Sequence, residues 1–449
     1  MYNHNPINFL ENTFKEVADN EAIIWNDVSY NYGWLYDRVQ YYKSLLNTKM
    51  VKSGSIVELK GDFTPESIAL ILALISHKCI VVPLTKSVKN EAKLLSIASV
   101  EHVFIIDDND NFEFSTIGVC KKNELYKEIE KRGHPGLVLF SSGTSGEPKC
   151  AVHDFSKLLA KFHEKKKALR TLNFLMFDHW GGLNTMFHIL SNGGVVISTN
   201  VRTPENICRL IERNKIELLP ASPTFLNLLL LSEVYKKFDM SSLSMISYGT
   251  EPMLTSTLIK LKRIFPKVKL LQTYGLIELG VLKSKSRSDD SLWVKLGGEG
   301  YILRVVDGLL EIKAESAMLG YLNAPSPFTE DGWFKTGDSV LVEDEYFKIL
   351  GRKSELINVG GEKVYPTEIE NVINEIDNVA EVLVYGESNP IIGKIIVAKV
   401  RLLQVEDKKQ FIVRLKSHCK SRLENYKVPV KVIVDNEVQY SDRMKKTRV

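Results

Sequence analysis

The sequence predicts an α/β fold: a large N-terminal domain of doubly wound sheets, which includes a small β module, and a smaller α+β domain at the C-terminus. Apolar strands alternate with helices through much of the chain, which is typical of parallel sheets covered by helices on both faces. Near residue 295, short β-rich runs with glycine turns replace this alternation. A compact stretch that contains both helices and strands follows Gly351 and Arg352.

The N-terminal units repeat a strand–helix–strand pattern. Residues 55–85 read SIVELKG, PESIALILALISHK and CIVVPL in succession, and further strands are predicted at 100–106 and 136–140. Residues 190–220 repeat the pattern, with a strand in LSNGGVVIST, a helix from Pro204 to Asn214 and a strand in KIELLPAS. Connections of this kind are right-handed in nearly all proteins, and we expect them to build parallel sheets.

The C-terminal part of the chain is organised differently. We expect the β module at 296–315 and 338–350. The elements expected after it are a helix from about Pro366 to Ile376, strands in VAEVLVYG and GKIIVAKVRLL, a basic amphipathic helix at 407–424 and a strand at 430–434. We therefore predict two domains, 1–351 and 352–449.

Composition narrows the class of protein. The 449 residues carry a net charge of only +4, which does not favour nucleic acid as a partner. The five cysteines are scattered without a CxxC pair, which favours a reducing compartment. The N-terminal residues lack the features of a signal peptide, and the strongest apolar run, IALILALI at 68–75, is too short to cross a bilayer. We expect a cytoplasmic protein without a membrane span, and its oligomeric state stays open.

A glycine-rich loop follows an apolar strand in LVLFSSGTSGEPK, residues 137–149. Glycines let backbone N–H groups approach an anion, hydroxyls add donors, and lysine adds positive charge for a polyphosphate. This is not the P-loop of GTPases and kinases, because Pro148 precedes the lysine. The alternative is a plain Ser/Gly turn. The candidate phosphate-binding residues are Ser141, Ser142, Gly143, Thr144, Ser145, Gly146 and Lys149.

Two further motifs carry candidate nucleotide contacts. In LLQTYGLIELG, a strand ends at Tyr274 and Gly275, and Glu278 follows. The ring could stack on a base and the carboxylate could hold Mg²⁺ against phosphates. The alternative is a buried tyrosine and a solvated glutamate. In GWFKTGD, Asp338 follows a Thr-Gly turn and could accept hydrogen bonds from two ribose hydroxyls, unless the segment is a common β-turn.

Two C-terminal segments are rich in glycine or basic residues. GRKSELINVGGEKVYPTEIE contains Arg352 and the pair Gly360 and Gly361, and its alternative reading is a linker followed by a helix cap. The tail SDRMKKTRV contains Lys445 and Lys446, although basic tails are commonly only solvated.

Together and in this order, the motifs closely resemble the adenylate-forming superfamily: acyl- and aryl-CoA synthetases, nonribosomal peptide adenylation domains and firefly luciferase. The resemblance covers nearly the whole chain, from NEAIIWNDVSYNYGWLYDRVQ at 20–40 to the final lysines. It implies that the protein uses ATP and Mg²⁺ to convert a carboxylic acid into an acyl-adenylate. It also implies transfer of the acyl group to a thiol, that of coenzyme A in acyl-CoA ligases.

The resemblance also implies roles for individual residues. Residues 141–149 would cradle the β- and γ-phosphates, with Lys149 among the catalytic residues. Glu278 would ligate Mg²⁺. Tyr274 would stack on adenine, and the segment Gly249-Thr250-Glu251-Pro252 would lie along the other adenine face.

The ribose and the reacting phosphate are assigned in the same way. Asp338 would hold the ribose, helped by Arg352. Lys445 would be the adenylation lysine, because its spacing to Arg448 fits the family's Gly-Lys-x-x-Arg ending. Lys446 is the alternative, one position along.

The family implies a mobile C-terminal domain, which rotates between the two half-reactions. Ser354 would be the hinge, and Gly360 and Gly361 would line the path of the thiol. Four positions depart from the family pattern: Cys150, Ile277, Ser354 and Met444. None of these departures removes a charged group that adenylation needs.

The segment that says most about the carboxylic acid substrate is FDHWGGLNTMFHILSNGG, residues 177–194. It resembles the His-x-x-Gly-Gly pattern of acyl- and aryl-CoA ligases, which would place His179 and Gly182 near the carboxylate tunnel. Asp178 is adjacent, where amino-acid-activating relatives have an aspartate, and His179 could instead be packed at a helix start. Ser222 and Phe225 are further candidate pocket walls, and their small or apolar neighbours favour a non-amino acyl substrate.

Two alternatives remain open. The chain could adenylate an amino or hydroxy acid and load the phosphopantetheine of an acyl carrier protein in trans. It could also be a degenerate nucleotide-binding regulatory protein, which the intact charged residues oppose. The identity of the acid and the choice between coenzyme A and a carrier protein are not determined by the sequence.

Overall fold

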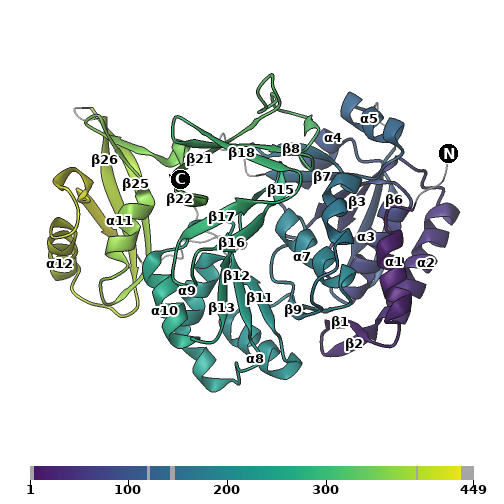
Figure 1. Cartoon of the computed structure of the whole chain (residues 1–449), viewed down its shortest axis with the longest axis horizontal. Coiled ribbons are helices and arrows are strands. Elements are labelled where there is room, and N and C mark those ends of the chain that lie inside the picture. The colour runs from purple at the N-terminus through teal and green to yellow at the C-terminus, as the bar shows by residue number, and fades with distance from the viewer. Residues whose placement is uncertain (1–4, 119–121, 142–146, 391–392, 436–449) are drawn as a thin grey trace.

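The structure is a computed structural model, and it describes residues 5–118, 122–141, 147–390 and 393–435. Figure 1 shows a large N-terminal body and a smaller C-terminal body beside it. Two seven-stranded sheets and a six-stranded sheet build the larger body, and a five-stranded sheet lies in the smaller one. The predicted α/β class, with a large N-terminal and a smaller C-terminal domain, is confirmed.

The first seven-stranded sheet has the strand order β20-β8-β7-β4-β3-β5-β6. Strands β7, β4, β3 and β5 are parallel, and the other three pair antiparallel. The bounds are β3 Ile56–Lys60, β4 Ile80–Leu84, β5 His102–Ile106, β6 Phe112–Thr116, β7 Gly136–Ser141, β8 Lys149–Asp154 and β20 Gly320–Tyr321.

Helix α3 (Pro65–Ser76) connects β3 to β4, as the sequence predicts. It begins where the Thr64 side chain accepts a hydrogen bond from the Ser67 backbone N–H, with proline in its first turn. The helix is apolar almost all round, and residues 67–75 are buried. Such a helix cannot face solvent, and its core cluster therefore includes residues of both seven-stranded sheets, such as Leu59 and Ile23.

The second seven-stranded sheet has the order β13-β12-β11-β9-β10-β1-β2, and all its neighbours are parallel except β1 and β2. The predicted helix from Pro204 to Asn214 is observed with those bounds as α8, capped by Thr203. The strands are β1 Glu21–Trp25, β2 Val28–Asn31, β9 Arg170–Leu172, β10 Val195–Ser198, β11 Leu218–Ala221, β12 Met245–Tyr248 and β13 Lys269–Gln272. Its other flanking helices are α7 Trp180–Ser191, α9 Pro223–Ser232 and α10 Thr255–Ile264.

The predicted β module is an antiparallel sheet with the order β16-β17-β22-β21-β19-β18. A short hairpin, β14 (Gly275–Leu276) and β15 (Gly280–Val281), leads into it. The bounds are β16 Lys283–Ser286, β17 Trp293–Gly297, β18 Tyr301–Val306, β19 Leu309–Ala314, β21 Phe334–Glu343 and β22 Tyr346–Arg352.

The C-terminal body has its own core, which joins residues of α11, α12 and the fifth sheet. Helix α11 ends at Ile373, three residues before the predicted Ile376, and the Asn374 side chain that follows donates to Ser256 Oγ at 2.8 Å. The bounds are β23 Ile357–Val359, β24 Glu362–Val364, α11 Pro366–Ile373, β25 Val379–Asn389, β26 Gly393–Leu402, α12 Lys408–Lys420 and β27 Lys431–Val434.

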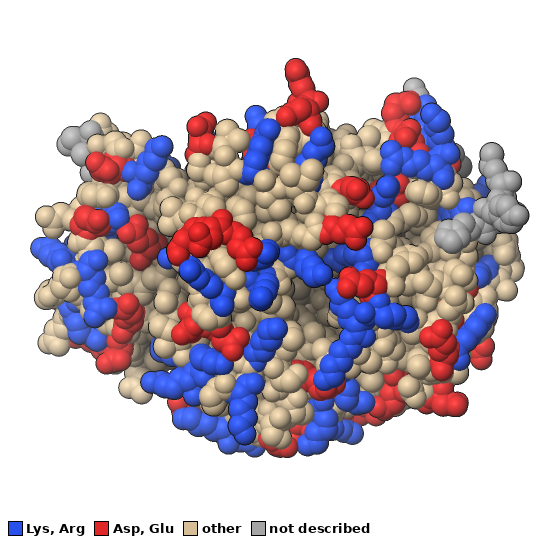
Figure 2. Space-filling model, viewed as in Figure 1, with Lys and Arg blue, Asp and Glu red and all other residues tan. Residues whose placement is uncertain are grey.

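The remaining helices lie in the N-terminal body: α1 Asn8–Glu16, α2 Tyr32–Thr48, α4 Glu91–Ala98, α5 Glu124–Arg132 and α6 Phe155–Leu159. No helix within the described ranges is long and apolar enough to span a membrane. Figure 2 shows both acidic and basic side chains distributed over the visible face.

Candidate active site

Three neighbouring parallel strands end at the same edge of the second sheet. β11, β12 and β13 end at Ala221, Tyr248 and Gln272, and the loops after them carry Ser222, Gly249 and Tyr274. Ligands in open α/β sheets bind outside the carboxyl ends of such strands. The sequence motifs therefore converge at the edge where a ligand is expected.

The loops at this edge lie in close contact. The Thr273 backbone N–H donates to the carbonyl of Tyr248 at 2.7 Å. A Cβ atom on Gly249 would lie only 2.5 Å from Thr273 Oγ1, so this position requires glycine. The segment from Gly249 thus lies directly against the loop that carries Tyr274.

Tyr274 and Asp338 form a buried polar pair in the site. The Tyr274 hydroxyl donates to Asp338 Oδ2 at 2.6 Å, and the two residues are 8% and 6% exposed. Asp338 on β21 is in register with Arg352 on β22, whose Nε lies 3.4 Å from Oδ1. Burial raises the pKa of Tyr274, and it also raises the pKa of Asp338 despite the opposing effects of Tyr274 and Arg352.

The backbone at Asp338 differs from the expected turn. Asp338 lies within strand β21, next to an irregularity in the pairing of that strand. Gly337 has a φ of +74°, and the Asp338 N–H donates to Thr336 Oγ1 at 3.0 Å. The Thr-Gly-Asp sequence therefore makes a bulge in a strand, which directs the carboxylate toward Tyr274.

Glu278 lies at the tip of the hairpin that begins at Gly275. Its Oε1 accepts a hydrogen bond from the Tyr321 hydroxyl at 2.6 Å, and the ring of Tyr321 lies 5.5 Å from Lys149 Nζ. Burial and the neighbouring Glu278 raise the pKa of Tyr321. The structure thus brings Glu278 and Lys149 together through a residue that the sequence reasoning missed.

Asn323 joins the same group from the loop after β20. Its side-chain amide donates to the carbonyl of Pro148 at 2.8 Å, and its Oδ1 accepts from the Cys150 N–H at 2.9 Å. These bonds bracket Lys149 on both sides. The only sequence feature that could have found Tyr321 and Asn323 is the short run GYLN between the β-rich segments, which by itself is a turn-like sequence.

Part of the predicted site falls outside the described residues. Ser141 ends β7 and is paired with Lys149 at the start of β8. Ser142, Gly143, Thr144, Ser145 and Gly146 lie outside the described ranges, as do Lys445 and Lys446.

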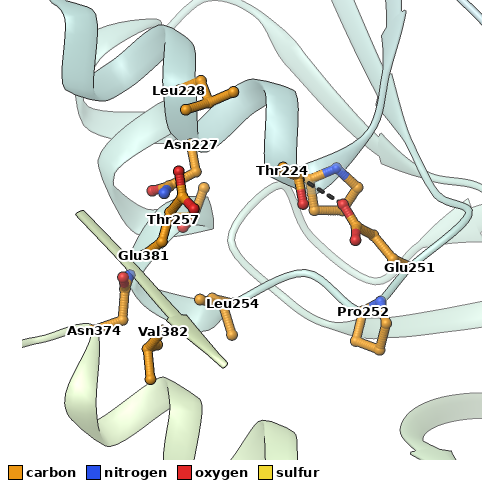
Figure 3. Close-up of a pocket in the computed structure, with 11 residues that line it drawn as sticks. Thr224, Asn227, Leu228, Glu251, Pro252, Leu254, Thr257, Asn374, Glu381 and Val382 are labelled. Atoms are coloured by element: carbon orange, nitrogen blue, oxygen red, sulfur yellow. Dashed lines mark hydrogen bonds between the residues drawn. The ribbon is translucent and has the colours of Figure 1, made fainter. Parts of the chain in front are cut away.

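Glu251 faces the boundary between the two bodies. Its Oε1 accepts from the Thr224 backbone N–H at 2.7 Å, and Thr250 before it has a φ of +72°. Figure 3 shows Thr224 and Glu251 with Asn374 and Glu381 of the C-terminal body around a pocket that is partly open to solvent. Glu251 therefore lies at an interdomain surface, whereas Tyr274 is buried.

The residues predicted for the acid pocket are engaged in the fold itself. His179 is the N-cap of α7, where its Nδ1 accepts from the Gly181 N–H at 3.1 Å, and Ser222 caps α9 in the same way. Gly182 is required by packing, since a Cβ atom there would lie 2.4 Å from the carbonyl oxygen of Met176. Phe225 is buried and packs on Phe174 with ring centroids 4.4 Å apart.

Gly360 and Gly361 form the two-residue turn of the β23–β24 hairpin. Val359 pairs with Glu362 across it, and the two glycines have φ angles of +60° and +98°. Such a turn favours glycine at both positions, and a Cβ atom at either one would meet nothing within 4 Å. Ser354 lies in the exposed 3₁₀ turn Lys353–Glu355 between β22 and this hairpin.

Glu278 is the residue that the sequence suggests for a divalent cation. The described residues contain no group of three His, Cys, Asp or Glu side chains arranged to hold a metal. Mg²⁺ in nucleotide sites, however, is commonly bound by one or two carboxylates together with substrate phosphates. Glu278, partly exposed at its hairpin tip beside Lys149, fits that second kind of site.

Comparison with known proteins gives consistent matches along the chain. A CoA ligase of Rhodococcus jostii for a methyl-dioxo-octahydroindenyl-propanoyl group is 25% identical over 94% of this chain and 93% of its own. Indoleacetate–CoA ligase of Aromatoleum aromaticum is 29% identical over 68% of this chain and 64% of its own. A 2-succinylbenzoate–CoA ligase of Listeria monocytogenes is 25% identical over 95% of each chain.

Solved structures share the fold over almost the whole chain. An anthranilate CoA ligase in complex with anthranoyl-AMP has a TM-score of 0.85 at 19% identity, covering 99% of this chain and 95% of its own. ATP-bound MatB from Rhodopseudomonas palustris has a TM-score of 0.81 at 22% identity, covering 98% and 97%.

Two family models account for the two parts of the chain. The AMP-binding enzyme model matches residues 10–307, and the AMP-binding enzyme C-terminal domain model matches residues 368–448. The first match spans the carboxyl-end loops around Tyr274 and Glu278. The chain belongs to the AMP-binding enzyme family.

Proposed function

We propose that this chain is an AMP-forming acid–thiol ligase of the acyl-CoA synthetase type. It would use ATP to convert a carboxylic acid into an acyl-adenylate and then transfer the acyl group to the thiol of coenzyme A. The observation that carries the proposal is the meeting of Tyr274, Asp338 and Arg352 at the carboxyl ends of parallel strands, beside Glu278. The names of the relatives, which are CoA ligases, support the choice of acceptor.

The buried pair of Tyr274 and Asp338 supports the nucleotide assignment. A carboxylate that is only 6% exposed needs polar partners: Tyr274 donates a hydrogen bond to it, and Arg352 forms an ion pair with it at 3.4 Å. The two hydroxyls of a ribose are further donors of the required kind. Adenine would lie between the Tyr274 ring and the segment that begins at Gly249, whose loops are in contact.

The residues proposed to contact the phosphates support the binding of a metal together with the nucleotide. Lys149 would hold the pyrophosphate, and Glu278 would ligate Mg²⁺ together with phosphate oxygens. Bound Mg²⁺ would neutralise charge on the triphosphate. Residues 142–146 complete the proposed loop in the sequence.

The chemistry follows from these placements. The substrate carboxylate attacks the α-phosphorus in line, a C–O–P bond forms, and the bond to pyrophosphate breaks with its electrons leaving on pyrophosphate. Lys445 would bridge the carboxylate and the α-phosphate. Because the charge develops mainly in the transition state, one such cationic contact is worth about 10²–10³ in rate.

The second half-reaction requires a different arrangement of the C-terminal domain. We place the domain boundary at 351/352 and the hinge at Ser354, in the exposed turn between the β module and the fifth sheet. The hairpin turn of Gly360 and Gly361 is exposed and free of steric neighbours, which would let it line the path of a pantetheine arm after rotation.

The substrate is a small carboxylic acid whose class the fold leaves open. The three relatives named above act on different acids, so their names do not select one. We favour a non-amino acyl substrate with His179, Gly182, Ser222 and Phe225 near its tunnel. An amino- or hydroxy-acid enzyme that loads a carrier protein in trans is the second candidate.

The cellular setting that we propose is the cytoplasm. Cys79, Cys150, Cys208 and Cys419 are buried free thiols, which is compatible with a reducing compartment. ATP and coenzyme A are the cosubstrates proposed.

An ATP–pyrophosphate exchange screen tests the adenylation reaction. Fatty, aryl, hydroxy and amino acids are each added to the folded protein with ATP and Mg²⁺. We expect exchange that depends on one class of acid and on the metal. If the protein binds ATP but exchanges with no acid, it is a nucleotide-binding regulator instead, and the proposal is wrong.

A second assay tests the acceptor. With the active acid, thioester formation is measured with coenzyme A and with a purified carrier protein in parallel. A product with coenzyme A supports the proposal, whereas a product only with the carrier protein selects the second candidate.

A further inference from the structure

Tyr321 lies between the two groups proposed to handle the phosphates. Its hydroxyl donates to Glu278 Oε1 at 2.6 Å, and its ring lies 5.5 Å from Lys149 Nζ. Within the described ranges, Tyr321 is the one hydrogen-bond partner of the Glu278 side chain. We propose that Tyr321 is a positioning residue that orients Glu278 for the metal and Lys149 for pyrophosphate, an inference that rests on the proposed function.

The backbone around Tyr321 makes it a connection between two separate elements. Residues 318–323, here called the β20 segment, bind on one side to the Glu278 loop, since the Met318 N–H donates to the carbonyl of Glu278 at 2.7 Å. On the other side, Tyr321 is paired with Ala151, and the Leu322 N–H donates to the carbonyl of Cys150 at 2.9 Å. The β20 segment therefore holds the metal carboxylate and the strand of Lys149 in fixed relation.

The side chain adds what the backbone cannot. One carboxylate oxygen of Glu278 is fixed by the phenol, and this sets the direction of the other oxygen. In this contact the phenol O–H is the donor, because an ionised carboxylate can only accept hydrogen bonds. Hydrogen-bond partners of ligating carboxylates commonly change metal affinity by about 10- to 100-fold when removed.

Two substitutions distinguish the contribution of the Tyr321 hydroxyl from that of its ring. Tyr321→Phe deletes the hydroxyl and retains the ring over Lys149, whereas Tyr321→Leu deletes both. A ring–ammonium contact at a partly exposed site is worth only about two- to fivefold in affinity. The metal effect should therefore appear in both variants, and the pyrophosphate effect only in the leucine variant.

Metal binding is read without turnover. Mn²⁺ is titrated into protein with saturating ATP and followed by electron paramagnetic resonance. Both variants should bind Mn²⁺ about 10- to 100-fold more weakly than the parent protein. In pyrophosphate exchange, half-saturating Mg²⁺ should rise by the same factor, and the rate at saturating Mg²⁺ should stay within a few-fold for Tyr321→Phe.

Tyr126→Phe is the matched control. It deletes another tyrosine hydroxyl of the N-terminal body, which donates to the carbonyl of Ala98 at 2.8 Å. Its melting temperature should fall as for any lost buried hydrogen bond, with no change in Mn²⁺ affinity. A positioning role and a merely structural role are thereby separated.

The outcomes decide between the two proposals. If Tyr321→Phe binds Mn²⁺ as the parent does while Glu278→Gln does not, the role of Tyr321 is wrong and the proposed function stands. If the phenylalanine variant does not fold, Tyr321→Leu carries the same metal test. If the parent binds Mn²⁺ and ATP but exchanges with no acid, the proposed function fails, and Tyr321 is still judged by its Mn²⁺ affinity.

Discussion

The nucleotide side and the acid side of the candidate site hold their residues in different ways. On the nucleotide side, Tyr274 and Asp338 bond to each other, and Glu278 bonds to Tyr321, from elements far apart in sequence. On the acid side, His179 and Ser222 bond to their own helices. The first set of contacts does little for local structure, whereas the second set builds helix ends.

This difference shows how far a motif residue can be explained without a ligand. The bond of buried Asp338 to Tyr274 joins two separate elements and closes no turn or helix, so a ligand role adds an explanation that the fold does not supply. His179 and Ser222 act as helix caps, a structural role that is worth roughly 1 kcal/mol each. Mutations should therefore affect chemistry on the nucleotide side and stability on the acid side.

The largest effect is expected from two substitutions that should each impair a different half-reaction. Lys445→Ala removes the cation proposed to join the carboxylate to the α-phosphate, and it should slow adenylate formation about 10²–10³-fold. Supplied with a pre-made acyl-adenylate, the same variant should still form thioester. Gly361→Leu should do the reverse, because its side chain would block the pantetheine arm while pyrophosphate exchange continues.

Two control variants make these opposite effects on the two half-reactions interpretable. Lys446→Ala tests the assignment of the lysine, and a defect there alone would shift the role by one position. Gly308→Leu places leucine in another hairpin turn, with a φ of +74° and no neighbour within 4 Å of a Cβ atom, so it reproduces the backbone strain at Gly361. If Lys445→Ala and Gly361→Leu impair the same half-reaction, domain rotation is the wrong model.

A smaller effect is expected from Asp338→Asn. The substitution keeps the shape of the side chain and removes the charge that Tyr274 and Arg352 face. Hydrogen bonds to a charged group are worth about 1.5–3 kcal/mol, so ATP should bind roughly 10- to 100-fold more weakly in calorimetry. The fold should persist.

Asp289→Asn is the matched control for this change. Asp289 also accepts from a cation and a backbone N–H, those of Lys262 and Leu270, but it lies outside the candidate site. ATP affinity within twofold of the parent for both variants would remove Asp338 from the ribose site and weaken the contrast between the two sides.

Much of the fold could be predicted because local signals agree with it. The helix Pro204–Asn214 starts with a threonine cap and proline and was placed to the residue. Helix α11 ends three residues before the predicted Ile376, and the next residue, Asn374, bonds through its side chain to Ser256 of the other body. A contact between residues so distant in sequence leaves no trace in local periodicity.

Candidate site residues could be proposed from the sequence only where a motif carries its own chemistry. Tyr274, Glu278 and Asp338 stand in recognisable runs, and the structure draws them to one edge. Tyr321 was not among the residues predicted from the sequence, because its position depends on the pairing of β20 with β8, which brings residues 320–321 beside 151–152. The bulge at Asp338 was taken for a turn, since Thr-Gly-Asp is compatible with both.

The smallest effect on activity is expected on the acid side, from His179→Ala. The change deletes the acceptor for the Gly181 N–H, and alanine is a poor N-cap, so the free energy of unfolding should fall by about 1 kcal/mol. Asn31→Ala, which uncaps α2 by losing its bond to the Trp34 N–H, should cost a similar amount. Denaturant unfolding and the half-saturating acid concentration are measured for both variants.

If His179 has a capping role alone, the two variants should lose similar amounts of stability. Their affinity for the acid should then stay within about threefold of the parent protein, which corresponds to less than 1 kcal/mol of binding free energy. If His179→Ala weakens acid affinity more than about tenfold while Asn31→Ala does not, His179 contacts the substrate as well as its helix. The acid side would then, like the nucleotide side, hold a residue that the fold alone does not explain.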